Sequence, residues 1–108
     1  MGFQIAAHRI GSIPFSTKDD SIAVLFVTSQ KRGRWILPKG KPKPKETYLS
    51  ACQRESFHEA GVCGVVLENF PLTGVITKHS EKYKQQFPVT YYPMLVTDQF
   101  NEWPEQAR

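Results

Sequence analysis

Two carboxylates near the middle of the chain have a spacing that suits metal chemistry. Glu55 and Glu59 are four residues apart, and on a helix this spacing places them one turn apart on the same face. Magnesium prefers hard oxygen ligands and usually takes one or two protein carboxylates. His58, three residues after Glu55, falls on the same face. The two glutamates are therefore a candidate metal site, with His58 as a candidate third ligand.

Basic residues gather just before these carboxylates. Seven of the fourteen Lys and Arg residues lie between Lys31 and Lys45, and no acidic residue interrupts them. Taken alone, such a run is usually a solvated loop. Here it leads directly into the carboxylates, so it would attract a polyphosphate while the carboxylates hold a neutralising metal ion. A phosphate-rich small molecule is the expected partner.

The element that must position the carboxylates is a helix with recognisable ends. Residues 38–45 contain three prolines and are expected to form a loop. We predict a helix over residues 47–60, with Thr47 as its N-cap and Gly61 just after its C-terminus. Its predicted inward face, at intervals of three or four residues, consists of Leu49, Cys52, Ser56 and Ala60.

The other patterned segments predict strands around this helix. Residues 22–28 are apolar and β-branched, which suits a strand buried on both faces at the centre of the sheet. Pro93 lies inside a predicted strand and requires a bulge or an edge position. Residues 78–86 are expected to form an exposed loop or hairpin tip, and residues 29–33 a turn. Further strands are predicted over residues 3–10, 34–37, 64–67, 74–77 and 89–97.

Size and composition limit the architecture to one domain. One helix among several strands predicts an α+β or layered α/β/α domain on a mixed β-sheet, and 108 residues with 40% hydrophobic content suffice for a single domain over residues 1–108. The longest apolar run, residues 22–27, is far shorter than the ~20 residues of a membrane-spanning helix. The N-terminus carries no recognisable leader, so we expect a cytoplasmic protein without a membrane partner.

The segment from Gly40 to Val62 resembles the Nudix box, whose pattern is G-x5-E-x7-R-E-U-x-E-E-x-G-U with U aliphatic. Ser56 stands at an aliphatic position and His58 at a glutamate position. Residues 34–40 also resemble the segment before the box in Nudix enzymes that act on diadenosine polyphosphates and diphosphoinositol polyphosphates. The matching box positions are Gly40, Glu46, Arg54, Glu55, Glu59, Gly61 and Val62.

This resemblance implies a sandwich of helix and sheet, and a hydrolase that uses Mg2+ or Mn2+ to cleave a phosphoanhydride bond. The implied substrate is a nucleoside diphosphate linked to another moiety, with dinucleoside and diphosphoinositol polyphosphates favoured. The backbone carbonyl of Gly40 would join Glu55 and Glu59 as a ligand, and Glu46 would pair with Arg54 to hold these carboxylates. A further strand and helix usually follow in the family, so the C-terminal part here is expected to be short or truncated. The substrate-binding candidates are Arg34, Lys39 and Lys41.

The histidine at a glutamate position leaves several interpretations open. His58 is a tolerated substitution with Glu55 and Glu59 sufficient, a sign of weakened or lost catalysis, or a ligand for a softer metal. Weakened catalysis gives the alternative function, a phosphate- or nucleotide-binding module with a Nudix fold. A nucleic-acid-binding domain is disfavoured, because Trp35 is the single aromatic residue of the basic segment. The general base, the exact substrate and the oligomeric state stay open.

Overall fold

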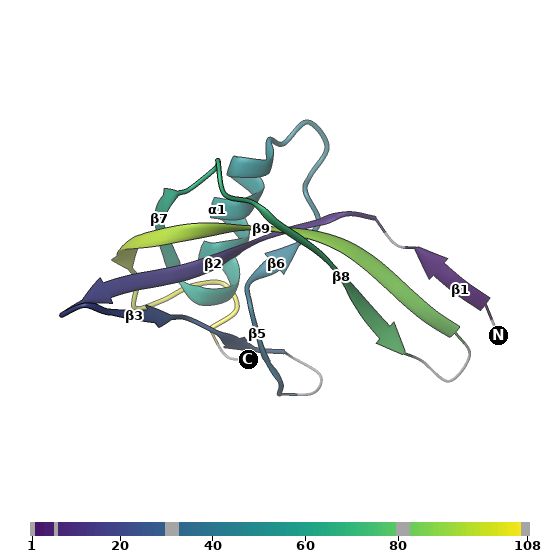
Figure 1. Ribbon diagram of the computed structural model, residues 1–108, viewed down its shortest axis with the longest axis horizontal. Coiled ribbons are helices and arrows are strands. Elements are labelled where there is room, and N and C mark those ends of the chain that lie inside the picture. The colour runs from purple at the N-terminus through teal and green to yellow at the C-terminus, as the bar shows by residue number, and fades with distance from the viewer. Residues whose placement is uncertain (1, 6, 30–32, 80–82, 107–108) are drawn as a thin grey trace.

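The computed structural model describes residues 2–5, 7–29, 33–79 and 83–106. These residues form a seven-stranded mixed sheet, a separate two-stranded ribbon and one helix (Figure 1), which confirms the predicted α+β class. Of the predicted α/β/α layers, the described residues contain the sheet and one layer of helix, α1, which contacts β2. The elements are β1 (Gly2–Ile5), β2 (Arg9–Lys18), β3 (Ser21–Val24), β4 (Val27–Thr28), β5 (Trp35–Ile36), β6 (Lys39–Gly40), α1 (Tyr48–Ala60), β7 (Val62–Val66), β8 (Leu72–His79) and β9 (Tyr83–Gln99).

The long strand β9 is the centre of the sheet. β1 and β2 pair with it in parallel, while β7 and β8 pair with it antiparallel. Figure 1 shows β9 and β2 passing in front of α1. Residues 83–86, predicted as part of a loop, are the start of this strand. Of the rest of that predicted tip, residues 78 and 79 are the end of β8, and residues 80–82 lie outside the described residues, as do residues 30–32 of the predicted turn.

The prediction that residues 22–28 form the buried centre was wrong. β3 pairs with β2 at the edge of the sheet, and the Ile22 side chain is 70% exposed. Asp19 and Asp20 both have positive φ, at 50° and 64°, which is the geometry of a tight hairpin turn. Asp19 and Asp20 are therefore the tip of the β2–β3 hairpin, and the apolar run begins in β3, the outer strand of this hairpin.

Pro93 is accommodated in the central strand, without the predicted bulge or edge position. On one side of β9, pairing with β8 ends at Tyr91 and pairing with β7 begins at Met94. Between them, the Pro93 carbonyl accepts a hydrogen bond from the Leu67 N–H at 2.8 Å. Because proline lacks the N–H that a continuous ladder requires, this junction between two neighbouring strands tolerates it.

The helix begins and ends as predicted. Thr47 Oγ1 accepts the Ser50 N–H at 3.1 Å, and Gly61 adopts a left-handed conformation with φ of 68°. The buried side of α1 includes Cys52, Ser56 and Ala60, as predicted, but Leu49 is exposed. Burial extends instead toward Glu55 and Glu59, because that side of α1 packs against β6. The helix therefore buries its acidic face together with its apolar one.

A buried hydroxyl pair explains the serine at an aliphatic position of the box. The Ser56 hydroxyl donates to the Cys52 carbonyl one turn earlier, at 2.6 Å, and lies 2.7 Å from the Ser12 hydroxyl on β2. Ile10, Ala51 and Cys52 form the apolar core around it. The polar side chain is thus satisfied inside the core, where an unpaired hydroxyl would be costly.

The segment after β9 returns along the C-terminal end of α1. The Phe100 N–H donates to the Gly61 carbonyl at 2.8 Å, and the Glu105 N–H donates to the His58 carbonyl at 3.0 Å. The Phe100 ring also packs edge-to-face on Phe57, with ring centroids 5.3 Å apart. Within the described residues this segment contains no further strand or helix. No helix in the described ranges is long and apolar enough to cross a membrane.

Candidate active site

Glu55 and Glu59 project from α1 toward the short strand β6. The Glu55 carboxylate packs so closely on Gly40 that a β-carbon at Gly40 would lie 2.3 Å from Glu55 Cδ. Glu59 Oε1 accepts the Lys39 N–H at 3.4 Å. Both glutamates are largely buried, at 9% and 8% exposure. The structure therefore brings together two carboxylates and the Lys39–Gly40 backbone.

A second glycine, on β2, allows β6 to lie this close to the sheet. Gly11 pairs with Lys39, and a β-carbon at Gly11 would lie 2.2 Å from the Pro38 carbonyl oxygen. The Ser12 N–H donates to the same carbonyl at 3.0 Å. Sequence reasoning assigned no part in the site to Gly11, because the tight approach arises between segments far apart in the chain. Two glycines thus set the positions of β6 and the carboxylates.

The predicted pairing of Glu46 with Arg54 is formed, and it is bidentate. Arg54 Nε lies 2.8 Å from Glu46 Oε2 and Nη2 lies 2.9 Å from Oε1. Arg54 Nη2 also donates to the Lys41 carbonyl at 2.9 Å, and Nη1 contacts the Glu55 carboxylate. One guanidinium therefore ties the loop to the helix and to a metal-ligand candidate.

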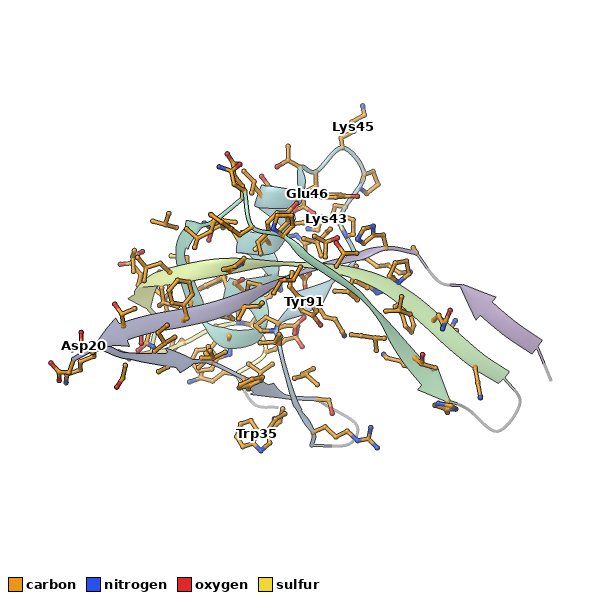
Figure 2. The ribbon with its side chains drawn as sticks, viewed as in Figure 1. Asp20, Trp35, Lys43, Lys45, Glu46 and Tyr91 are labelled. Carbon is orange, nitrogen blue, oxygen red and sulfur yellow. The ribbon has the colours of Figure 1, made fainter. Side chains whose placement is uncertain are left out.

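This pairing dominates the electrostatics of the loop. The Arg54 guanidinium, followed by the Lys43 N–H at 2.8 Å, lowers the pKa of Glu46 to about 2. Glu46 in turn raises the pKa of Arg54. Figure 2 shows Lys43 and Glu46 together beside the start of α1, while Lys45 points away from the molecule. The loop is thus fixed at one end by a charged pair that stays ionised.

His58 is placed differently from the two glutamates. The described part of the chain holds no group of three or more His, Cys, Asp or Glu side chains positioned for a metal ion, so His58 is not gathered with Glu55 and Glu59. Its ring packs edge-to-face on Phe57, with centroids 6.4 Å apart. Its carbonyl anchors the C-terminal segment, so the helix end near His58 serves as a packing surface.

The basic candidates lie at three different places. Lys39 is half-buried beside the carboxylates, and its pKa is lowered mainly by burial and then by Lys78, against the opposing effect of Glu59. Lys41 is exposed and contributes its carbonyl to Arg54. Arg34 belongs to the β4–β5 ribbon, where its N–H donates to Ser29 Oγ at 3.2 Å. The structure thus brings Lys39 to the carboxylates and leaves Arg34 on the ribbon, next to the protruding Trp35 (Figure 2).

A tyrosine that the sequence did not suggest also borders this site. The pKa of Tyr91 is raised, first by burial and then by the negative charge of Glu59. Its ring lies 3.0 Å from the position of a β-carbon at Gly11. No local pattern marks this residue, because β9 and β2 bring it to the site from opposite ends of the chain.

The donors at this place fit a hard divalent cation. Two carboxylates and nearby backbone carbonyls are the oxygen ligands that magnesium takes. Burying two like charges on one helix face is costly unless positive charge compensates them. Arg54 and Lys39 supply part of that compensation, and a bound divalent cation would supply the rest.

Comparisons with known proteins show which family the chain resembles. The model of the NUDIX domain family matches residues 8–106. Nudix hydrolase 17, mitochondrial, from Arabidopsis thaliana is 33% identical over 104 residues, which cover 90% of this chain and 56% of that protein. Diphosphoinositol polyphosphate phosphohydrolase 3-beta from Homo sapiens is 27% identical over 99 residues, which cover 92% of this chain and 57% of that protein.

The fold has solved counterparts as well. The crystal structure of a C. elegans Ap4A hydrolase binary complex superposes with a TM-score of 0.63 at 17% identity, over 94% of this chain and 75% of that one. The chain spans about half the length of the curated relatives that it matches. Because the family match covers nearly all of its residues and the fold agrees, the chain belongs to the Nudix family.

Proposed function

We propose that the chain is a metal-dependent hydrolase of a phosphoanhydride bond in a nucleoside diphosphate linked to another moiety. The observation that carries this proposal is the convergence of the buried carboxylates of Glu55 and Glu59 on the backbone of β6. Dinucleoside polyphosphates and diphosphoinositol polyphosphates are the favoured substrates, because one relative and one solved structure are named for compounds of these classes.

Glu55, Glu59 and the Gly40 carbonyl would hold Mg2+ or Mn2+, which when bound neutralises the phosphate oxygens. Arg54 fixes the Glu55 carboxylate while it is itself held by both oxygens of Glu46. Lys39 places a positive charge beside the carboxylates, where it would attract a phosphate oxygen. Burial of both glutamates limits the water around them and strengthens each of these electrostatic contacts.

A second candidate, a phosphate- or nucleotide-binding module with weakened catalysis, is favoured by the position of His58. In the family pattern a glutamate stands there, and in the described part of the structure no third His, Cys, Asp or Glu side chain joins Glu55 and Glu59 in a group that could hold a metal ion. Such a module would bind phosphates saturably without turnover. A cytoplasmic location stays a prediction, since one matched relative is named as mitochondrial.

The two functions are separated by one assay. Purified protein is incubated with Ap4A and with a diphosphoinositol polyphosphate, in Mg2+, in Mn2+ and in chelator. Removing both carboxylates should cost several kcal/mol of transition-state stabilisation, so the double variant Glu55→Gln, Glu59→Gln is expected to lose more than about 100-fold in kcat/KM. Glu68→Gln, an exposed site after β7, is the matched control and should retain activity.

Two outcomes decide against hydrolysis at Glu55 and Glu59. Equal phosphate release from the wild type and the double variant would show that the carboxylates are not the catalytic groups. No release in either metal, together with saturable binding measured by calorimetry, would establish the binding module instead.

A further inference from the structure

A set of cations outside the Nudix box gathers around one aromatic ring of the sheet. The Arg9 guanidinium carbon lies 4.5 Å from the centroid of the Phe87 ring, and Lys78 Nζ lies 5.1 Å from the same centroid. Phe87 is 6% exposed. Arg9 comes from β2 and Lys78 from β8, two of the strands that pair with β9 (Figure 1). Two cations from different strands therefore lie over this one ring.

Lys39 joins this set from β6. Gly11 is paired with Lys39, and Arg9 lies two residues before Gly11 on the same strand, so Arg9 and Lys39 share one face of the sheet. We call Arg9, Lys39 and Lys78, together with Phe87, the Phe87 cluster.

Two members of the Phe87 cluster, Arg9 and Lys78, form no ion pair within the described ranges, whereas Lys39 lies beside Glu55 and Glu59. Both ion pairs found there belong to Arg54. Arg9 Nη1 donates to the Ala7 carbonyl at 2.8 Å, and burial lowers the pKa of Arg9. The aromatic face attracts each cation but does not neutralise its positive charge. Three positive charges on one face of the sheet repel each other, and a bound polyanion would relieve this repulsion.

The cluster continues directly from the carboxylates. The Lys39 backbone N–H donates to Glu59, and Lys39 lies on the same face of the sheet as Arg9. We propose that the Phe87 cluster binds a phosphate group of the substrate beyond the phosphoanhydride bond that is cleaved at Glu55 and Glu59. This proposal rests on the proposed function. It assigns Arg9 and Lys78 as specificity residues, which select substrates with three or more phosphates in a chain or on one ring.

The test measures direct binding, separately from turnover. Isothermal calorimetry in chelator, where metal-dependent hydrolysis is absent, titrates inorganic tripolyphosphate and inositol hexakisphosphate into the wild type and the variants Lys78→Gln, Arg9→Gln and Arg9→Lys. A hydrogen bond to a charged group contributes enough that each charge-removing variant should bind about tenfold more weakly. Arg9→Lys, which keeps the charge, should lose less. Lys18→Gln, an exposed lysine at the far end of β2, is the matched control.

The two probes identify the source of the phosphates. A loss with tripolyphosphate alone supports a linear chain, a loss with inositol hexakisphosphate alone supports a phosphorylated ring, and a loss with both supports a shared site. Affinities for both probes that change no more in Lys78→Gln and in Arg9→Gln than in Lys18→Gln would overturn the proposal. Because no turnover is measured, an inactive hydrolase would leave this result valid, and an active hydrolase with unchanged binding would reject the cluster alone.

Discussion

The carboxylate side of the site and the Phe87 cluster hold their charges in opposite ways. On the carboxylate side, Arg54 binds Glu46 through two hydrogen bonds and also contacts Glu55. In the Phe87 cluster, packing against a ring and the pairing of strands bring the cations together. Fixed, partnered charges suit groups that must keep one geometry, whereas Arg9 and Lys78, which form no ion pair within the described ranges, suit the binding of a charged ligand.

The largest expected effect comes from filling the space between Gly40 and Glu55. In Gly40→Ala the new β-carbon would lie 2.3 Å from Glu55 Cδ, so the carboxylate must move. We expect kcat/KM to fall about 100-fold or more, because a displaced metal ligand is lost to the reaction, and stability to fall by about 1–3 kcal/mol through overpacking. Steady-state kinetics and urea denaturation measure the two effects.

Gly74→Ala is the control for this substitution, because a β-carbon there meets nothing within 4 Å. It should leave both quantities near their wild-type values. Full activity in Gly40→Ala would show that Glu55 does not need its observed position, and the carboxylate side would then be no more fixed than the Phe87 cluster.

The acid stability of the fold should depend on Glu46. Its pKa in the folded state is about 2, lowered first by Arg54, whereas an unfolded glutamate titrates near ~4.3. The stabilisation from the pair is therefore fully present above the unfolded pKa and is lost as the pH falls toward about 2. Urea midpoints of the wild type and Glu46→Gln should differ at pH 6 and converge as the pH falls toward 2.5. A constant difference across this range would assign the effect to packing instead of charge.

The smallest effect is expected at His58. Because its side chain is not gathered with Glu55 and Glu59 in the described structure, His58→Glu should change magnesium-dependent turnover by no more than about twofold, as for other substitutions away from buried networks. A tenfold rise would show that the histidine limits turnover. A third carboxylate at position 58 would then belong with Glu55 and Glu59 on the carboxylate side.

Local signals predicted the carboxylate side well. The helix and its caps depend on residues within a few positions of each other, so Thr47 and Gly61 could be identified directly, and the spacing of Glu55 and Glu59 placed both on one face. The Glu46–Arg54 pair followed from the family pattern. What the sequence did not reveal was the burial of these glutamates, because it results from β6 packing against the helix.

Long-range pairing explains what sequence reasoning missed. The centre of the sheet was assigned to residues 22–28 from their apolar composition, but a short apolar run cannot be distinguished by composition as central or peripheral. Arg9 and Lys78 meet at Phe87 only through the register of β2 and β8 with β9. Gly11 and Tyr91 are neighbours for the same reason, so a single sequence gives no local mark of either.

The central position of β9 also determines when the fold can form. Residues 9–15 find their parallel partners in residues 89–95, so the first long strand of the chain cannot complete its pairing until residues 89–95 have been synthesised. Contacts between such distant segments slow folding, because a long loop must close before they form. During translation the sheet that supports the site would therefore be completed only after β9 has left the ribosome.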